Sequence, residues 1–247
     1  MIKLITGEMY RLLHKKSIYT YFCSLAAGYF LIAFIRSDGF NAQSIVNDAF
    51  NFFNFLPAIV GGFLFSSIYT DDLIAKNLIT LVGFGMSKAK IVLAKIVLTA
   101  LLGTVIFALA PLLLYVTHAA FGWTATASTM TMVYAVSFKY LLITIGYSAL
   151  SGIVVYGLQR TTFAMVLYIL FAFNIVGSLF KLFLVNMVGV GFASLITDRL
   201  MPGITDRIFA GIISGGPLAL PVIEYIIYVA IVVMVSVIAF NKKEMEF

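Results

Sequence analysis

Charged side chains are scarce in this sequence. Asp, Glu, Lys and Arg make up 11% of its 247 residues, whereas 62% are hydrophobic and the mean hydropathy is +1.09. A water-soluble domain of this size could not bury so much apolar surface, so we expect lipid to surround most of the chain. The formal net charge of +6 then raises the question of where the lysines lie relative to a bilayer, and we expect no nucleic-acid partner.

Cysteine is almost absent too. The single Cys23 excludes a disulfide within the chain and a cysteine-cluster metal site. The residues before it, TYF, are not the small residues that the cleavage site of a lipoprotein requires. No small-residue cleavage signature follows the first apolar segment, so we expect that segment to be retained.

Motifs for catalysis and for nucleotide binding are missing as well. The chain has two histidines, no H-E-x-x-H motif, and no Gly-Lys pair of the kind that a P-loop contains. The residues GYSA at 146–149 resemble the signature of an intramembrane serine protease. However, we expect neither His14 nor His118 to lie within reach of Ser148. We therefore expect that the chain is not an enzyme by itself and holds no cofactor and no metal ion.

Long apolar runs are what the sequence has in abundance. Each run is close to or longer than the ~20 helical residues that cross a hydrocarbon core, and none shows the alternation of a membrane β-strand. We therefore predict a single all-α integral membrane domain over residues 1–247, with six transmembrane helices. The predicted spans are 17–35, 50–68, 91–117, 132–156, 163–185 and 218–240.

Lysine and arginine are distributed unevenly between the two sides of these spans. With the N-terminus in the cytoplasm, eleven of them lie on the cytoplasmic side and five on the outer side or at outer helix ends. The cytoplasmic set is Lys3, Arg11, Lys15, Lys16, Lys76, Lys88, Lys90, Lys95, Arg160, Lys242 and Lys243. The outer set is Arg36, Lys139, Lys181, Arg199 and Arg207. This asymmetry predicts a multi-pass protein of the plasma membrane with both termini in the cytoplasm.

Two cytoplasmic elements are predicted besides the spans. In the first sixteen residues, apolar side chains recur at helical spacing among Lys3, Glu8 and Arg11, which predicts an amphipathic helix lying on the inner leaflet. In the second predicted loop, the residues Thr-Asp-Asp at 70–72 are typical of a helix start, and Gly85 of a helix end. We predict a capped helix of about three turns in this loop, placed to contact a partner.

The connection between the fifth and sixth predicted spans contains the sequence ITDR twice, at Ile196–Arg199 and Ile204–Arg207. Thr-Asp is typical of a helix start, and the Pro-Gly pair between the two copies is typical of a turn. We therefore predict two short helices on or partly within the outer leaflet.

Three charges fall in the outer third of the predicted membrane: Lys139, Lys181 and Glu224. An isolated charge at that depth costs a few kcal/mol unless it is paired, hydrated or able to reach the headgroups. Lys181 can reach them with its long stem, whereas Glu224 needs a lysine, a polar cavity or a subunit interface. We treat the three as candidates for an outer gate or substrate path, with a structural ion pair as the alternative.

Taken together, these elements resemble the permease subunits of the ABC type-2 exporter family. The stretch DD…NLITLVGFGMSKAKIVLAK fits the family pattern of an acidic residue, a short helix, a glycine-containing turn and a lysine that begins span three. It departs from that pattern in having Asp-Asp where the family more often has Glu. The resemblance implies that the short helix is a coupling helix, which docks on a separate P-loop ATPase subunit holding the ATP and Mg²⁺. The coupling residues it implies are Asp71, Asp72, Leu73, Lys76, Asn77, Leu78 and Leu81.

The resemblance also implies a dimer, formed with a second copy or with a homologous permease, in a bacterial plasma membrane. Small permeases of this architecture are similar to those that export peptides such as bacteriocins and amphipathic cytolysins, or that confer immunity to them. The alternative is a secondary transporter or a channel-like protein that works without an ATPase. Pro57, Gly61 and Gly62 predict a kink in span two, although no inverted repeat and no midplane acid accompany it.

Overall fold

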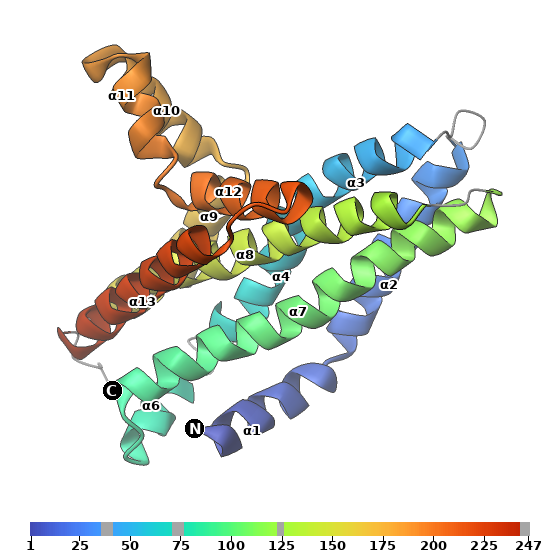
Figure 1. Cartoon of the computed structure of the whole chain (residues 1–247). Helices are drawn as coiled ribbons and strands as arrows, with labels where there is room; N and C mark the ends of the chain where they lie inside the picture. The colour runs from blue at the N-terminus through green and yellow to red at the C-terminus, as the bar shows by residue number, and fades with distance from the viewer. Residues whose placement is uncertain (36–41, 71–76, 123–125, 243–247) are drawn as a thin grey trace.

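Figure 1 shows a computed structural model of the chain, in which the helices form an elongated bundle. The structure describes residues 1–35, 42–70, 77–122 and 126–242, and every regular element within these ranges is a helix. Two π-helical turns, η2 (Pro57–Gly61) and η3 (Ser66–Thr70), flank α4. The α-helices are α1 (Ile2–Leu13), α2 (Lys16–Ile35), α3 (Ala42–Leu56), α4 (Gly62–Phe65), α6 (Asn77–Gly83), α7 (Lys88–Ala120), α8 (Ala127–Leu158), α9 (Thr161–Ala172), α10 (Ile175–Val188), α11 (Val190–Thr197), α12 (Met201–Ser214) and α13 (Ala219–Lys242).

Several helices have the length and composition of membrane spans. In the part of the chain that the structure describes, four segments pass this test, and the bent pair of α9 and α10 would be a fifth if it crosses as one unit. The four are Val46–Tyr69, Lys88–Ala120, Ala127–Leu158 and Ala219–Lys242. The first predicted span coincides with α2, a helix of 20 residues. The protein is thus all-helical with apolar helices of spanning length, as predicted, and the six-span topology stays a prediction.

The centre of the bundle is α8, which packs against α3, α7, α9, α12 and α13. α7 has 33 residues and α8 has 32, so both extend beyond their predicted spans. At 1.5 Å per residue each is about 50 Å long, whereas a hydrocarbon core is about 30 Å thick. Both helices must therefore project from the membrane or lie tilted in it.

The second predicted span is a helix with two π-helical turns rather than a simple kink. Pro57 begins the first of these turns, where a residue without an N–H cannot complete the regular helical hydrogen bonds. The hydroxyl of Tyr168, on α9, donates a hydrogen bond of 2.7 Å to the carbonyl of Pro57. The predicted irregularity is present, and α9 supplies its polar partner.

The fifth predicted span is broken, which corrects the expectation of one helix over 163–185. α9 and α10 are bent by 65° at a break around Asn174, whose backbone has a φ of 55°. Asn adopts this left-handed conformation more easily than most residues. A Cβ at Gly177 would lie 2.2 Å from the side-chain oxygen of Asn174, so Gly177 leaves room for that side chain. In Figure 1, α10 and α11 project sideways from the bundle.

The two copies of ITDR do not begin helices, which corrects that prediction. The first copy lies at the end of α11, and the second lies inside α12. Pro202 stands in the first turn of α12, where its missing N–H would have no helical partner anyway. The Pro-Gly pair therefore starts a helix instead of forming a turn.

The two chain termini lie at the same end of the bundle, next to α6 (Figure 1). At this end the Nζ atom of Lys88, in the first turn of α7, donates a 2.7 Å hydrogen bond to the carbonyl of Phe240 on α13. The side of the membrane that this end faces is the cytoplasmic side in the predicted topology. We refer to it below as the inner end, and to the opposite end as the outer end.

Candidate functional site

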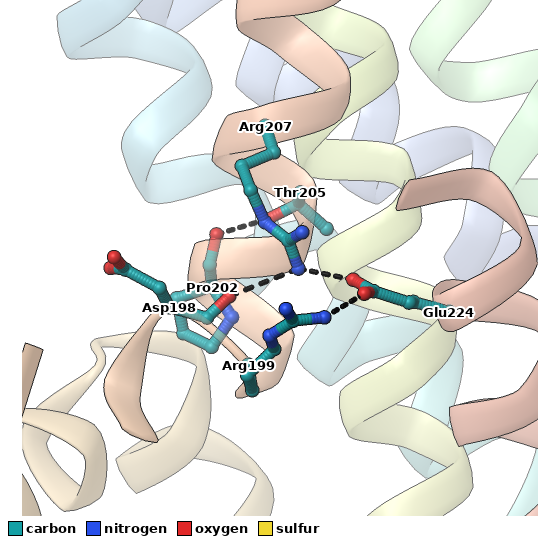
Figure 2. Close-up of polar contacts among 6 residues, drawn as sticks. All are labelled: Asp198, Arg199, Pro202, Thr205, Arg207 and Glu224. Carbon is teal, nitrogen blue, oxygen red and sulfur yellow. Dashed lines mark hydrogen bonds and ion pairs between the residues drawn. The ribbon is translucent and has the colours of Figure 1, made fainter. Parts of the chain in front are cut away.

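The first candidate site is a group of charges where α12 packs against α8 and α13. Glu224, on α13, accepts hydrogen bonds from both Arg199 and Arg207 (Figure 2). Arg207 also donates a 3.2 Å hydrogen bond to the backbone carbonyl of Asp198. The side chain of Glu224 is 18% exposed, against 67% for Arg199 and 34% for Arg207. Glu224 therefore has the charged partners that its depth requires, and they are arginines rather than the lysine that the sequence suggested.

Lys139 belongs to the same group. Its Nζ atom lies 2.5 Å from a carboxylate oxygen of Asp206 on α12, and it lies over the rings of Tyr140 and Phe209. Asp206 and Arg207 are consecutive, so the second ITDR motif supplies one partner to α8 and one to α13. We call Lys139, Arg199, Asp206, Arg207 and Glu224 the outer ion cluster. Each of its two carboxylates is bonded to at least one cation, and Glu224 is shared by two arginines, which favours a role in holding α12 in place.

Lys181 lies apart from this cluster, on α10. It lines a hollow of about 280 Å³ together with Asn174, Asp198 and Asp206, and the hollow has both polar and apolar walls. In Figure 2 the carboxylate of Asp198 points away from the two arginines. Among the described residues Lys181 makes no ion pair. The structure thus brings Lys139 and Glu224 into one cluster through α12 and leaves Lys181 at its edge.

The second candidate site is the connection at the inner end. Asp71, Asp72, Leu73 and Lys76 lie outside the described residues. The described part of the connection is α6 and the turn that follows it. That turn satisfies the last carbonyls of α6, because the N–H of Gly85 bonds to the carbonyl of Val82 and that of Met86 to the carbonyl of Leu81. Gly85 has a φ of +80°, as this helix ending requires.

The side chains of α6 and its turn divide into two groups. Leu78 is only 5% exposed and packs in the hydrophobic core, and the half-buried Leu81 packs against that core. Phe84 is 85% exposed at the tip of the turn. Ser87 then stands at the cap position of α7, although its side chain makes no capping hydrogen bond. Leu78 therefore holds α6 on the bundle, and Phe84 is the apolar group that this element presents outward.

An ion pair that the sequence did not predict joins α1 to α7. The Nζ atom of Lys95 lies 3.2 Å from a carboxylate oxygen of Glu8, and Arg11 donates a 2.6 Å hydrogen bond to the same oxygen. Lys95 is 1% exposed. A lysine buried to this extent requires a negative partner, and α1 supplies one. We call Glu8 and Lys95 the inner ion pair.

The signal for this pair was present in the sequence. Lys95 stands about one helical turn inside the predicted third span, so its ammonium reaches the headgroups only if its stem bends back. Glu8 is the only acidic residue of the first sixteen. A deep lysine and a single acid on an adjacent amphipathic helix could have been paired on that basis.

Neither histidine lies near Ser148 in a way that would support catalysis. His118, on α7, is buried, and its two ring nitrogens face the carbonyl of Leu114 at 2.8 Å and a carboxylate oxygen of Asp48 at 3.7 Å. His14 lies at the end of α1 against Tyr10. Gly146 of the GYSA sequence provides room for the side chain of Met201. Within the described ranges, no group of three or more His, Cys, Asp or Glu residues could hold a metal ion.

The chain was compared with protein-family models, with curated proteins and with solved structures, and none of them matches it.

Proposed function

We propose that the chain is the transmembrane permease subunit of an ATP-driven exporter, which moves a hydrophobic or amphipathic substrate, most plausibly a peptide, out of the cell or the membrane. The observation that carries this proposal is the connection between η3 and α7 at the inner end. Its helix is fixed by Leu78, and its turn presents the exposed Phe84. An exposed aromatic residue on a rigid, capped turn is a suitable anchor for a pocket on another protein.

The energy for this transport would come from a partner. The sequence has no P-loop, so the ATP and Mg²⁺ would be held by a separate ATPase subunit that receives α6 and Phe84. The second permease, identical or homologous, would complete the path across the membrane. The outer ion cluster would then hold α12 against α8 and α13 on the exit side, with Lys181 nearest to the exposed surface.

Purification of the tagged chain from its native membrane, followed by identification of associated P-loop ATPases by mass spectrometry, tests the proposal. Wild-type chain should retain one such ATPase, and Phe84→Asp should lose most of it. Leu158→Asp is the matched control, because Leu158 is also an exposed apolar residue (55%) close to a helix end. Retention of the ATPase by Phe84→Asp, or its absence from the wild-type preparation, would overturn the proposal.

A second candidate function, a secondary transporter, is favoured by a different observation. The second and fifth predicted spans are both interrupted, and such interruptions in corresponding positions of two halves are typical of transporters with helices broken at the substrate site. The two interruptions also lie close together, because the ring of Phe173, at the break between α9 and α10, packs against that of Phe55, two residues before Pro57, with ring centroids 6.4 Å apart. Transport in vesicles that depends on an ion gradient and continues without ATP would support this function over the exporter.

A further inference from the structure

An apolar groove runs along the side of the bundle between α2 and α7. It has a volume of about 410 Å³, and its wall contains almost no polar surface. Phe22 and Ala26 line it on α2, and Leu56 and Val60 form its floor. The volume falls within the ~300–1,000 Å³ range of small-molecule pockets, yet no polar group is available to orient a polar ligand. We call this feature the lateral groove.

The lateral groove is long enough for a hydrocarbon chain. On α7 it extends from Leu102 to Leu113, which is about 16 Å along the helix axis at 1.5 Å per residue. On α2 it begins at Ile18, close to the end of α1. An extended hydrocarbon chain lying along the groove would therefore run from the end of α1 toward the outer end of α7.

Aromatic contacts fix α2 at the margins of the groove. The ring of Tyr21 stacks on Phe63 at 4.2 Å, and its hydroxyl donates a 2.7 Å hydrogen bond to the carbonyl of Ile59. Toward the outer end, Phe30 and Phe34 lie 5.8 and 6.1 Å from the ring of Phe121, which follows α7. These contacts hold α2 in place while the groove between them stays open to the surrounding lipid.

The inner end of the groove carries positive charge. Leu13, the last residue of α1, lines the groove, and the residues that follow it are His14, Lys15 and Lys16. Ile18, also in the groove wall, lies within one turn of Lys16 on α2. A ligand with an apolar chain in the groove would therefore have its polar end beside two consecutive lysines.

From this combination we propose that the lateral groove binds one acyl chain of an anionic phospholipid, with the headgroup phosphate beside Lys15 and Lys16. The apolar wall takes the chain, and the lysines favour a headgroup with net negative charge. This site does not depend on the proposed exporter function, and it would exist equally in a secondary transporter.

Native mass spectrometry of the delipidated protein, titrated with phosphatidylglycerol or phosphatidylethanolamine carrying identical palmitoyl and oleoyl chains, tests this proposal. Ala26→Trp fills the groove from α2, and Ala27→Trp is its matched control because the neighbouring Ala27 is exposed and does not line the groove. Lys16→Gln removes one headgroup charge, and Lys90→Gln removes an exposed lysine elsewhere at the inner end. Thermal unfolding of each variant establishes that it is folded.

The wild-type chain should retain one phosphatidylglycerol molecule at least about tenfold more tightly than phosphatidylethanolamine. Ala26→Trp should abolish this retention, Lys16→Gln should reduce the preference between the two lipids, and both controls should behave as wild type. Equal retention by Ala26→Trp and Ala27→Trp would overturn the groove as the site. Equal binding of the two lipids by the wild type would overturn the anionic-lipid assignment. So would a hydrophobic peptide that displaces both bound lipids equally well.

Discussion

Glycine at position 61 leaves the space that the hydroxyl of Tyr168 occupies. A Cβ at Gly61 would lie 1.9 Å from that oxygen, whereas a Cβ at the neighbouring Gly62 would make ordinary contacts with the end of Met165, at 3.5 Å, and the ring of Tyr168, at 3.9 Å. The hydroxyl is also held by its hydrogen bond to Pro57. Two adjacent glycines thus have different roles, and only the first is required by the packing of α9 against the π-helical turn.

We predict that Gly61→Ala lowers the free energy of unfolding by about 1–3 kcal/mol, because it forces Tyr168 out of its position. Gly62→Ala, the matched control, should change it by less than about 1 kcal/mol. Adding Tyr168→Phe to Gly61→Ala should restore part of the loss by removing the atom in conflict. Thermal unfolding in detergent gives the stability of the wild type, the two glycine variants and the double variant. Equal losses of stability for Gly61→Ala and Gly62→Ala would contradict this account.

The two arginines of the outer ion cluster are unequal partners of Glu224. Arg207 is less exposed than Arg199 and has a second acceptor in the carbonyl of Asp198. We predict that Arg207→Gln lowers the free energy of unfolding by about 1–3 kcal/mol, and Arg199→Gln by less than about 1 kcal/mol. Unfolding measurements on the single variants and on the doubles with Glu224→Gln give the coupling energies. A larger coupling energy between Arg199 and Glu224 than between Arg207 and Glu224 would show that Arg207 is not the stronger partner.

The variant Glu224→Gln also distinguishes a structural role of the outer ion cluster from a role as an outer gate. A structural role predicts lower stability and expression, with partial recovery when Arg207 is neutralised as well. A gate predicts normal assembly with loss of transport. Each of the five charges in the outer ion cluster has a partner of opposite charge, which favours the structural outcome.

At the scale of elements, α1 is attached to the bundle by more than its apolar face. Leu12 is buried, and Glu8 reaches the buried Lys95 on α7. An amphipathic helix that only floated on lipid would not need a charged contact inside the bundle. The inner ion pair therefore couples the position of α1 to that of α7, next to the connection that we propose as the docking element.

We predict that Glu8→Gln lowers the free energy of unfolding by about 1–3 kcal/mol, because it weakens the compensation of a buried cation. Lys95→Met in the same background should restore part of this loss, since it removes the charge that needs a partner. Lys3→Gln, on the same helix and exposed, is the control and should have little effect. Unfolding in detergent compares the stability of the wild type, Glu8→Gln, its double variant with Lys95→Met, and Lys3→Gln. A double variant less stable than Glu8→Gln alone would contradict the pairing of Glu8 with Lys95.

At the scale of the whole molecule, the N-terminus and the C-terminal end of α13 lie at the same end of the bundle, as the predicted even number of membrane crossings requires (Figure 1). The bundle places α6 at that same end, and the end of α7 and the start of α8 at the other (Figure 1). Thr205, on α12, is buried and would be a poor labelling position. Exposed positions next to the connections are the better probes of orientation.

We predict that, in a Cys23→Ser background, a cysteine replacing Phe84 reacts only with a reagent that enters the cytoplasm. A cysteine replacing Ala127, which is exposed at the start of α8, should react with an impermeant reagent from outside. Labelling intact cells and opened vesicles with an impermeant maleimide gives the comparison. The reverse pattern would invert the topology, and accessibility of both positions from one side would change the number of crossings between them.

The sequence by itself determined the class of this protein and the existence of most helices. The apolar runs allow only helices in lipid, because each backbone polar group must be bonded within its own segment. Gly85 marked the end of α6, because glycine readily adopts the positive φ of a helix ending. Pro57 marked the irregularity of the second span, because proline has no backbone N–H to donate within a helix.

Only the tertiary structure decided how the charges pair and where the fifth span breaks. Glu224 meets Arg207 through a contact between different helices, which periodicity and composition do not encode. The sequence offered Glu8 as a partner for Lys95, and only the packing of α1 against α7 brings the two side chains together. The bend at Asn174 depends on a side chain that fits because Gly177 lies opposite. Likewise Leu78 and Phe84 are equally apolar in sequence, and packing against the bundle buries the first and leaves the second exposed.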